Sequence, residues 1–376
     1  MLRSIYEQLY RANLPSFAKL AFHELLPRQE LGSCWHVDVM ADALQGCLAR
    51  GTRRLILNAP PRSLKSHCAS VAAVVFALGH EPTLKVMVIV GSRALARDLQ
   101  LRATALMRNP RCRALFPHLQ VTEVPGEIIL RHGGGIFYAV VGQSLIGRGA
   151  DLIVIDDPLA SHLAHDRAAR DFVNAWYDAE VIPRLNNKAN GVIVLVMQRL
   201  HPDDLTGHVC QHGRWSKIVL SAIALDDEEW TLHRRRAIVR RKGEPLQPHR
   251  EGTGQLIEIL REIEAYNFSA QYLQQPLQSP SLQRVGFYHN PRPTDWQPEM
   301  GLSKGGFVKI RESRYILFEV FGTGPQPPTA SASLPYSDEE WEAAAQIQQK
   351  RLVANAQGDR DRCQDHRGSE QAAPAS

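Results

Sequence analysis

Eight residues in the first part of the chain have the types and spacing of a phosphate-binding loop. An apolar run at residues 55–57 ends at Asn58, and a helix of small residues is expected at residues 69–78. Between them stands the sequence Ala59-Pro60-Pro61-Arg62-Ser63-Leu64-Lys65-Ser66. The backbone N–H groups of such a loop and the N-terminus of the following helix attract anions. Lys65 would then reach the β- and γ-phosphates of a nucleotide, and the Ser66 hydroxyl would ligate Mg²⁺.

Two carboxylates follow another apolar run later in the chain. Residues 152–155 are all apolar and end in Asp156 and Asp157. Asp156 would hold Mg²⁺ directly or through water, and Asp157 would orient an attacking water. A strand, a loop ending in Lys-Ser, a helix and a distant acidic strand make up the layout of a P-loop NTPase. Each motif alone also has an ordinary explanation, because Lys65-Ser66 could begin a solvated helix and the carboxylates could cap a turn.

The loop departs from the usual phosphate-binding pattern at two positions. That pattern has glycine where this chain has Ala59 and Leu64. Because a leucine in the left-handed region is strained by about 1–2 kcal/mol, Leu64 must either avoid positive φ or bear that strain.

Composition limits the class of protein. The chain has 376 residues, of which 44% are hydrophobic and 22% charged, which is typical of one large or two smaller globular domains. A net charge of +5 permits a nucleic-acid partner without requiring one. The six cysteines are scattered, which favours reduced thiols in a cytoplasm. We expect no membrane segment and no signal peptide, because the apolar runs are short and interrupted.

The order of the remaining segments indicates the fold class. Helices are expected in residues 2–51, 92–107, 167–180 and 256–266, and strands at residues 86–90, 127–130, 136–141, 152–155, 192–197 and 218–220. The strands at residues 127–141 flank three glycines and should form a hairpin. Short Val/Ile runs alternating with helices predict an α/β three-layer (α/β/α) domain of P-loop NTPase type with a mainly parallel sheet. The ligand site should lie at the carboxyl ends of the strands.

The C-terminal part has a different character. Residues 233–250 are strongly basic and would form a solvated face, a flexible loop or a DNA contact. Residues 307–310 and 315–321 could pair as a hairpin. Residues 322–335 read as a linker, Ser337 begins a helix that reaches about Val353, and the last residues are polar and expected to be disordered.

With these segments in place, the chain resembles the large terminase subunit of tailed bacteriophages, the motor that packages viral DNA. Four motifs in order carry the resemblance: PPRSLKS at residues 60–66, GQSLIGRGAD at 142–151 leading into Asp156-Asp157-Pro158, MQRLHPDDLTGH at 197–208, and FSAQYLQQP at 268–276. The third resembles the coupling segment of that family, and the fourth the element that closes its ATPase domain. The resemblance covers about residues 35–276.

The resemblance implies roles for individual residues. ATP would bind along Ala59, Pro60, Pro61, Arg62, Ser63, Leu64, Lys65 and Ser66. Ser66 and Asp156 would hold Mg²⁺, Asp157 would orient the water, and Arg62 would steady the charge of the γ-phosphate. Gln198 would sense the γ-phosphate, unless it is merely an amide at a strand end. Trp35 and His36 resemble the segment before the loop, and we expect them chiefly to pack in the core.

The resemblance also implies partners and a location. The chain would be an ATP-hydrolysing motor subunit that moves double-stranded DNA, bound without sequence preference, into a procapsid. Its partners would be a portal protein, a small terminase subunit and further copies of itself, in the cytoplasm of a bacterial host and without a membrane. The alternatives are a helicase-like P-loop ATPase acting on nucleic acid, and a decayed prophage fragment that binds nucleotide weakly.

The predicted domain layout departs from the family after residue 276. We expect a helical segment at residues 1–50, the ATPase domain at 51–276, a remnant of the nuclease junction at 277–322, and a linker, helix and tail at 323–376. Family members carry an RNase H-like nuclease of about 200 residues at this point. Here Glu319 is the only carboxylate inside an apolar strand, so endonuclease activity is not expected of this chain.

Overall fold

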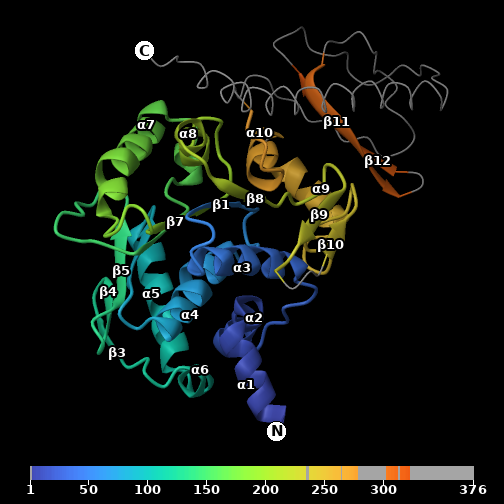
Figure 1. Cartoon of the computed structure of the whole chain (residues 1–376). Coiled ribbons are helices and arrows are strands. Elements are labelled where there is room, and N and C mark those ends of the chain that lie inside the picture. The colour runs from blue at the N-terminus through green and yellow to red at the C-terminus, as the bar shows by residue number, and fades with distance from the viewer. Residues whose placement is uncertain (1, 234–236, 264, 278–301, 312–313, 322–376) are drawn as a thin grey trace, which may run out of the picture. The chain divides into compact units, whose positions relative to one another are not determined.

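The computed structural model describes residues 2–233, 237–263, 265–277, 302–311 and 314–321. The chain divides into two compact units, residues 1–256 with 267–278, and residues 257–266 with 279–376. Figure 1 shows the elements of both units, coloured along the sequence.

An eight-stranded sheet forms the centre of the first unit, in the order β3-β4-β5-β2-β6-β7-β1-β8. Its strands are β1 (Arg54–Asn58), β2 (Lys85–Val90), β3 (Val121–Val124), β4 (Glu127–Leu130), β5 (Gly135–Val140), β6 (Leu152–Asp156), β7 (Val192–Met197) and β8 (Ser216–Val219). The strands from β5 to β8 in that order run parallel, whereas β3, β4 and β5 pair antiparallel. The predicted mainly parallel sheet and the hairpin of β4 and β5 are confirmed, and β3 is an additional edge strand.

Helices cover both faces of this sheet (Figure 1). One face packs against α2 (Leu14–Leu25), α3 (Trp35–Leu48), α4 (Val74–His80), α5 (Arg93–Arg108) and α6 (Pro110–Leu115), and the other against α7 (Arg167–Trp176) and α8 (Leu205–His212). The remaining helical segments are α1 (Leu2–Ala12), the π-helical turns η1 (His67–Ala73), η3 (Tyr177–Val181) and η5 (Phe268–Tyr272), the 3₁₀ turns η2 (Ser161–Leu163) and η4 (Ile182–Arg184), and α9 (Thr253–Glu262) and α10 (Ala265–Asn267). The three-layer α/β/α architecture is therefore confirmed.

Side chains alternate between the two cores along each buried strand. In β6, Leu152 and Val154 belong to the core under α2 to α6, while Ile153 and Ile155 belong to the core under α7 and α8. Because successive side chains of a strand point to opposite faces, a strand covered on both sides must be apolar throughout. This requirement explains why β2, β6 and β7 are continuous Val/Ile/Leu/Met runs rather than alternating ones.

Local sequence sets where several helices begin. Ser92 caps α5 by accepting a hydrogen bond from the Leu95 N–H at 3.2 Å, and Asp166 caps α7 by accepting from Ala168 and Ala169. Such side chains satisfy backbone N–H groups that have no partner inside the helix. The cap at Ser92 thus starts α5 at Arg93, three residues after β2 ends at Val90.

The register of the sheet brings the candidate residues to one edge. Strand β7 lies between β1 and β6, with Asn58 opposite Met197 and Asp156 opposite Val196. The segments that follow these three parallel strands therefore leave the sheet at the same carboxyl edge. The expectation that Gln198 follows a strand next to the acidic strand is confirmed.

One residue of the basic region at residues 233–250, Arg240, differs from the sequence prediction. The region contributes β10 (Ala237–Arg240), which pairs antiparallel with β9 (Glu228–Thr231). Arg240 is only 2% exposed, and its Nη1 lies 3.2 Å from Glu228 Oε2. Arg240 is thus neither part of a solvated face nor available to DNA, because a cross-strand carboxylate and three carbonyl groups hold it inside the protein.

In the second unit, β11 (Leu302–Arg311) pairs antiparallel with β12 (Arg314–Phe321), which confirms the predicted hairpin. Glu319 stands opposite Gly305 in this pair. The predicted linker, helix and tail at residues 322–376 lie outside the described residues. The predicted domain boundaries remain a prediction.

Candidate nucleotide-binding site

The phosphate loop, residues 59–66, joins the end of β1 to η1 and contains two left-handed residues. Arg62 has φ 61° and Leu64 has φ 64°. The hydroxyl of the buried Ser63 donates to the Pro60 carbonyl at 2.7 Å and braces the turn from inside. Leu64 therefore takes the strained alternative, at a cost of about 1–2 kcal/mol. Residues held in such conformations are common where a backbone must present its N–H groups to a ligand.

The two ends of the phosphate loop are held in different ways. Ala59 is fully buried, and its N–H donates to the Met197 carbonyl of β7 at 3.4 Å. At the other end, the Lys65 side chain is only 7% exposed, and its Nζ lies 3.0 Å from Asp157 Oδ2. Arg62 is exposed. The loop thus places one shielded cation at the helix start and a second, exposed one three residues earlier.

Asp156 is a fully buried carboxylate at the end of β6. It accepts hydrogen bonds from the hydroxyls of Ser66 at 3.0 Å and Ser70 at 2.6 Å. Burial raises the pKa of Asp156 to about 6, and the negative charge of Asp157 adds to this rise. Lys65 and the two hydroxyls oppose it by stabilising the charged form. The Asp156 carboxylate at the end of β6 and the Ser66 hydroxyl of the phosphate loop are therefore in hydrogen-bond contact, although they are 90 positions apart in sequence.

The residues at this point fit a magnesium ion. Mg²⁺ prefers oxygen ligands and in nucleotide sites takes only one or two from the protein, the others coming from phosphates and water. The Ser66 hydroxyl and an Asp156 carboxylate oxygen, 3.0 Å apart, form such a pair. The described residues contain no group of three or more His, Cys, Asp or Glu that could hold a metal alone. A metal–nucleotide complex, rather than a protein-only metal centre, matches these ligands.

Asp157 has an unusual backbone conformation, with φ 43°. Its Oδ1 accepts the Gln198 N–H at 3.2 Å, and its carbonyl accepts the Gly91 N–H at 3.2 Å. A Cβ at position 91 would lie 2.7 Å from that carbonyl, so only glycine permits this approach. Asp157 is thus fixed by the ends of β2 and β7 as well as by Lys65.

Gln198 lies directly after β7, beside Asp157. Its Nε2 donates to the Ser161 hydroxyl at 3.0 Å, which ties the end of β7 to the segment after β6. Its Oε1 is buried and has no hydrogen-bond partner among the described residues. The side chain of Gln198 is therefore held at Ser161 through its amide nitrogen and has one open acceptor oxygen.

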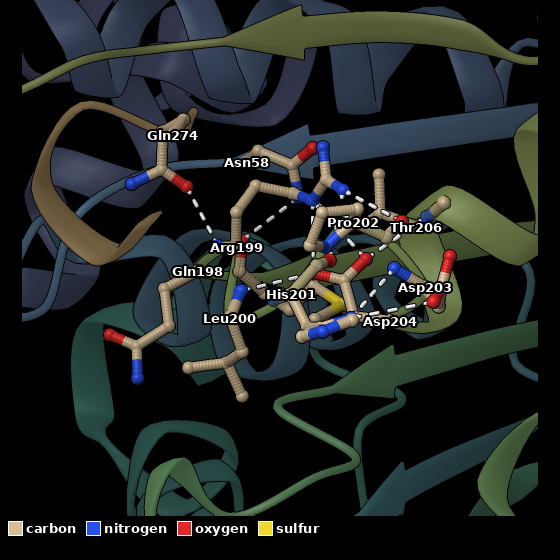
Figure 2. Close-up of polar contacts among 12 residues, drawn as sticks. Asn58, Gln198, Arg199, Leu200, His201, Pro202, Asp203, Asp204, Thr206 and Gln274 are labelled. Atoms are coloured by element: carbon tan, nitrogen blue, oxygen red, sulfur yellow. Dashed lines mark hydrogen bonds and ion pairs between the residues drawn. The ribbon is translucent and has the colours of Figure 1, made fainter. Parts of the chain in front are cut away.

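Residues 199–204 form a turn around one buried carboxylate, Asp204, which also caps α8 (Figure 2). Asp204 accepts from Arg199 Nε at 2.9 Å, from the N–H groups of Leu200 and His201, and from that of Gly207 at 2.9 Å. One carboxylate therefore fixes the path of the chain immediately after Gln198.

Three further hydrogen bonds tie this turn and the residues on either side of it to neighbouring segments (Figure 2). The Asn58 amide at the end of β1 donates to the Met197 carbonyl and to Thr206 Oγ1, both at 3.1 Å. The Arg199 N–H donates to Gln274 Oε1 at 2.9 Å, and Gln274 has φ 60°. The third and fourth sequence motifs, far apart in the chain, are therefore in direct contact.

No protein-family model matches the sequence, and no curated protein matches it. Several solved structures are similar to it. The large terminase ATPase domain of Thermus phage P74-26, in a mutant form, is 12% identical with a TM-score of 0.46, over 68% of this chain and 98% of that one. The large terminase of bacteriophage HK97 is 14% identical with a TM-score of 0.42, over 77% of this chain and 61% of that one.

A DEAD-box helicase bound to single-stranded RNA and UDP-BeF is also similar, at 13% identity and a TM-score of 0.37, over 55% of this chain and 45% of that one. The chain thus spans about three fifths of the HK97 large terminase and less than half of the helicase chain. All these TM-scores lie below 0.5, so a proposed function has to rest on the residues of this chain.

The structure brings together Lys65, Ser66, Asp156, Asp157 and Gln198 from the predicted set. Sequence reasoning missed a second group: Asn58, Ser70, Gly91, Asp204 and Gln274 support the site through the contacts above. A signal existed for Ser70, since it follows Ser66 by one helical turn and so faces the same side. Asp204 also had a local signal, because an aspartate directly before an expected helix is a common N-cap. Asn58, Gly91 and Gln274 make contacts with segments distant in sequence, which a single sequence does not reveal.

Proposed function

We propose that the chain is the ATP-hydrolysing motor subunit of a DNA-packaging terminase of a phage or prophage, which couples ATP hydrolysis to the translocation of double-stranded DNA into a procapsid. One observation carries the ATPase part of this proposal. Lys65 lies 3.0 Å from Asp157, and Ser66 lies 3.0 Å from Asp156, at the carboxyl edge of a parallel sheet. The order of the four terminase-like motifs supports the packaging part.

The proposed roles follow from position and charge. Lys65 and the N–H groups of the phosphate loop bind the β- and γ-phosphates, and the exposed Arg62 steadies the charge of the γ-phosphate. Ser66 and Asp156 hold Mg²⁺, which when bound neutralises phosphate charge. Asp157 holds and orients the attacking water.

Gln198 is proposed to report the loss of the γ-phosphate. Its N–H contacts Asp157, and the next residue, Arg199, contacts Gln274 in the fourth motif. A change at the Asp157 carboxylate thus has a direct route through two hydrogen bonds to the closing element of the ATPase part. This arrangement supports a motor rather than a simple nucleotide-binding protein.

The proposed DNA-facing surface is the exposed side of α5 and α6. It carries six exposed arginines: Arg93, Arg97, Arg102, Arg108, Arg111 and Arg113. Asp98, Glu123 and Glu24 pair with Arg102, Arg108 and Arg111. Arg93, Arg97 and Arg113 have no ion pair within the part of the chain that the structure describes. Such arginines suit sequence-independent contacts with phosphates.

This surface is proposed as the main DNA contact in place of the basic stretch at residues 233–250. In that basic stretch Arg240 is buried, and the exposed Arg241 lies 2.7 Å from Asp227. Both guanidinium groups thus already have carboxylate partners. We therefore assign non-specific duplex binding chiefly to α5 and α6, where Arg93, Arg97 and Arg113 are exposed and have no ion pair among the described residues.

The remaining partners are proposed from the terminase resemblance: a portal protein, a small terminase subunit and further copies of this chain on a procapsid in the host cytoplasm. Within the described residues, no helix has the length and apolar character needed to cross a bilayer.

The test of the proposed function is ATP turnover by the purified protein in Mg²⁺, measured alone, with duplex DNA, and with DNA and procapsids that carry the portal. A packaging motor should hydrolyse ATP faster with DNA and faster still with both. Stimulation by DNA with strand separation and no response to the portal would favour the helicase-like alternative. Weak nucleotide binding without turnover in any condition would indicate the decayed fragment.

A further inference from the structure

The segment formed by residues 226–233 and 237–251, which follows the last strand of the sheet, packs on α3. The Trp230 ring lies 5.1 Å from the Trp35 ring, and the Arg240 guanidinium lies 5.7 Å from the same Trp35 ring. His233 Nδ1 lies 2.7 Å from Asp42 Oδ2. Aromatic and charged contacts therefore fix this segment against the helix that precedes the phosphate loop in sequence.

From this segment Arg250 reaches the phosphate loop itself. Its Nη1 donates to the Arg62 carbonyl at 2.5 Å. Arg62 and Arg250 are 188 positions apart in sequence. Arg250 Nη2 also lies 3.6 Å from Glu251 Oε1, which orients the guanidinium from its other side.

The Arg62 carbonyl matters because of the conformation of the loop. Backbone N–H groups can converge on an anion only where the intervening carbonyls point outward, as in turns that contain left-handed residues. Arg62 and Leu64, at φ 61° and 64°, hold this conformation without glycine. Because each is strained by about 1–2 kcal/mol, the loop needs outside contacts to keep that shape. A guanidinium bonded to the outward carbonyl of Arg62 is such a contact.

A buried histidine shows that the same cations act on the loop's surroundings. His36 is 1% exposed and lies beside the backbone of Ser63 in the phosphate loop. Burial lowers the pKa of His36 to about 4, and the positive charge of Arg240 adds to this effect. The Ser63 backbone opposes it, and the charge of Arg250 adds a smaller lowering. The Arg250 guanidinium is therefore one of the cations that disfavour a charged His36 beside the loop.

We propose that Arg250 is a positioning residue for nucleotide binding, which holds the phosphate loop in its binding conformation through the Arg62 carbonyl. This inference rests on the proposed ATPase function. Arg250 acts through the backbone of the loop rather than on the reacting atoms. Its loss should therefore weaken binding of the nucleotide and leave the chemical step of bound nucleotide nearly unchanged.

The test compares Arg250→Ala and Arg250→Lys with the wild type in the full-length protein. Kd for Mg–ATP is measured by titration, and KM and kcat by ATP turnover. We expect Arg250→Ala to raise Kd and KM about tenfold, the loss of one charge-assisted hydrogen bond, with kcat within about twofold. Arg250→Lys keeps a donor and a charge and should recover part of the affinity. Arg241→Ala, which removes an exposed arginine paired with Asp227 in the same segment, is the matched control.

Unchanged Kd in Arg250→Ala, or a loss of kcat at unchanged Kd, would overturn the inference. If Arg250→Ala does not fold, the inference is tested with Arg250→Lys and Arg250→Gln, in which KM should rise while kcat stays nearly unchanged. Failure of the proposed function is distinguishable, because then wild type itself would not bind Mg–ATP. Tight binding by both wild type and Arg250→Ala would remove only the role of Arg250.

Discussion

Asp156 and Asp157 are adjacent in sequence but differ in burial and in partners. Asp156 is fully buried between two hydroxyls, whereas the Asp157 side chain is 27% exposed and faces Lys65. The first environment suits a metal ligand, and the second a group that handles water. Changing each carboxylate to an amide should therefore affect nucleotide binding and ATP turnover differently.

Asp157→Asn keeps the shape of the side chain and removes its charge. It should retain Mg–ATP binding and lose turnover by about 10²-fold or more, since it removes the charge proposed to orient the attacking water. Asp156→Asn should instead raise the Mg²⁺ concentration needed for nucleotide binding. Binding and turnover are measured for both variants across a Mg²⁺ series. Unimpaired and identical behaviour of the two would rule out this division of roles.

His36 should make stability depend on pH. Its pKa is about 4 in the folded protein and near 6.5 when exposed. Between these values the unfolded chain binds a proton that the folded chain does not, so stability falls as pH drops from 6.5 towards 4. The full effect is on the order of 3 kcal/mol. Urea unfolding at several pH values should show that the free energy of unfolding falls less steeply with decreasing pH in His36→Phe than in wild type. An equal dependence on pH in both proteins would contradict a neutral, buried His36.

At the scale of elements, the turn at residues 199–204 depends on one carboxylate. Asp204→Asn would place an amide donor where the other groups are also donors. It would also leave the Arg199 guanidinium without its carboxylate partner. Removing one member of a buried ion pair typically destabilises by about 3–5 kcal/mol. We expect a loss of this order in the free energy of unfolding, together with lower ATP turnover because Gln198 is displaced.

The neighbouring Asp203 provides a matched control for that change. Its side chain is 67% exposed, so Asp203→Asn should alter stability by less than about 0.5 kcal/mol. Chemical denaturation of both variants measures the difference. Similar small effects at both positions would show that the turn does not depend on Asp204.

The strands around the site could be predicted from sequence because burial on both faces forces continuous apolar runs. β2, β6 and β7 were therefore recognisable, and the acidic end of β6 with them. The β9–β10 hairpin was not, because a basic stretch with Arg240 reads as solvated unless Glu228 on the paired strand is known to neutralise it. The conformation of Leu64 could not be predicted either. The local sequence shows that a left-handed leucine would be strained, but it does not reveal a distant contact with the loop such as that of Arg250 with the Arg62 carbonyl.

At the scale of the whole molecule, α5 and α6 should dominate binding to duplex DNA. Each arginine that contacts a phosphate contributes about 0.9 to the slope of log affinity against log salt. Arg93→Ala with Arg97→Ala should therefore weaken binding at low salt and lower that slope by up to about two. Fluorescence anisotropy with a labelled duplex at several salt concentrations measures it.

The control for DNA binding is Arg167→Ala. Arg167 is exposed and lies on α7, which packs on the other face of the sheet. This variant should bind like wild type. Affinity that does not change with salt in any of these proteins would contradict contacts with the phosphate backbone.

The central claim is that the chain hydrolyses ATP through the phosphate loop. Lys65 supplies the shielded cation of that loop, so its removal should abolish catalysis while the buried strands around it remain folded. The decisive measurement is steady-state release of phosphate from ATP in Mg²⁺ by wild type and by Lys65→Ala, with circular dichroism to confirm that both are folded. The account predicts turnover by wild type and a fall of at least about 10²-fold in the variant; a folded Lys65→Ala protein that hydrolyses ATP like wild type would contradict it.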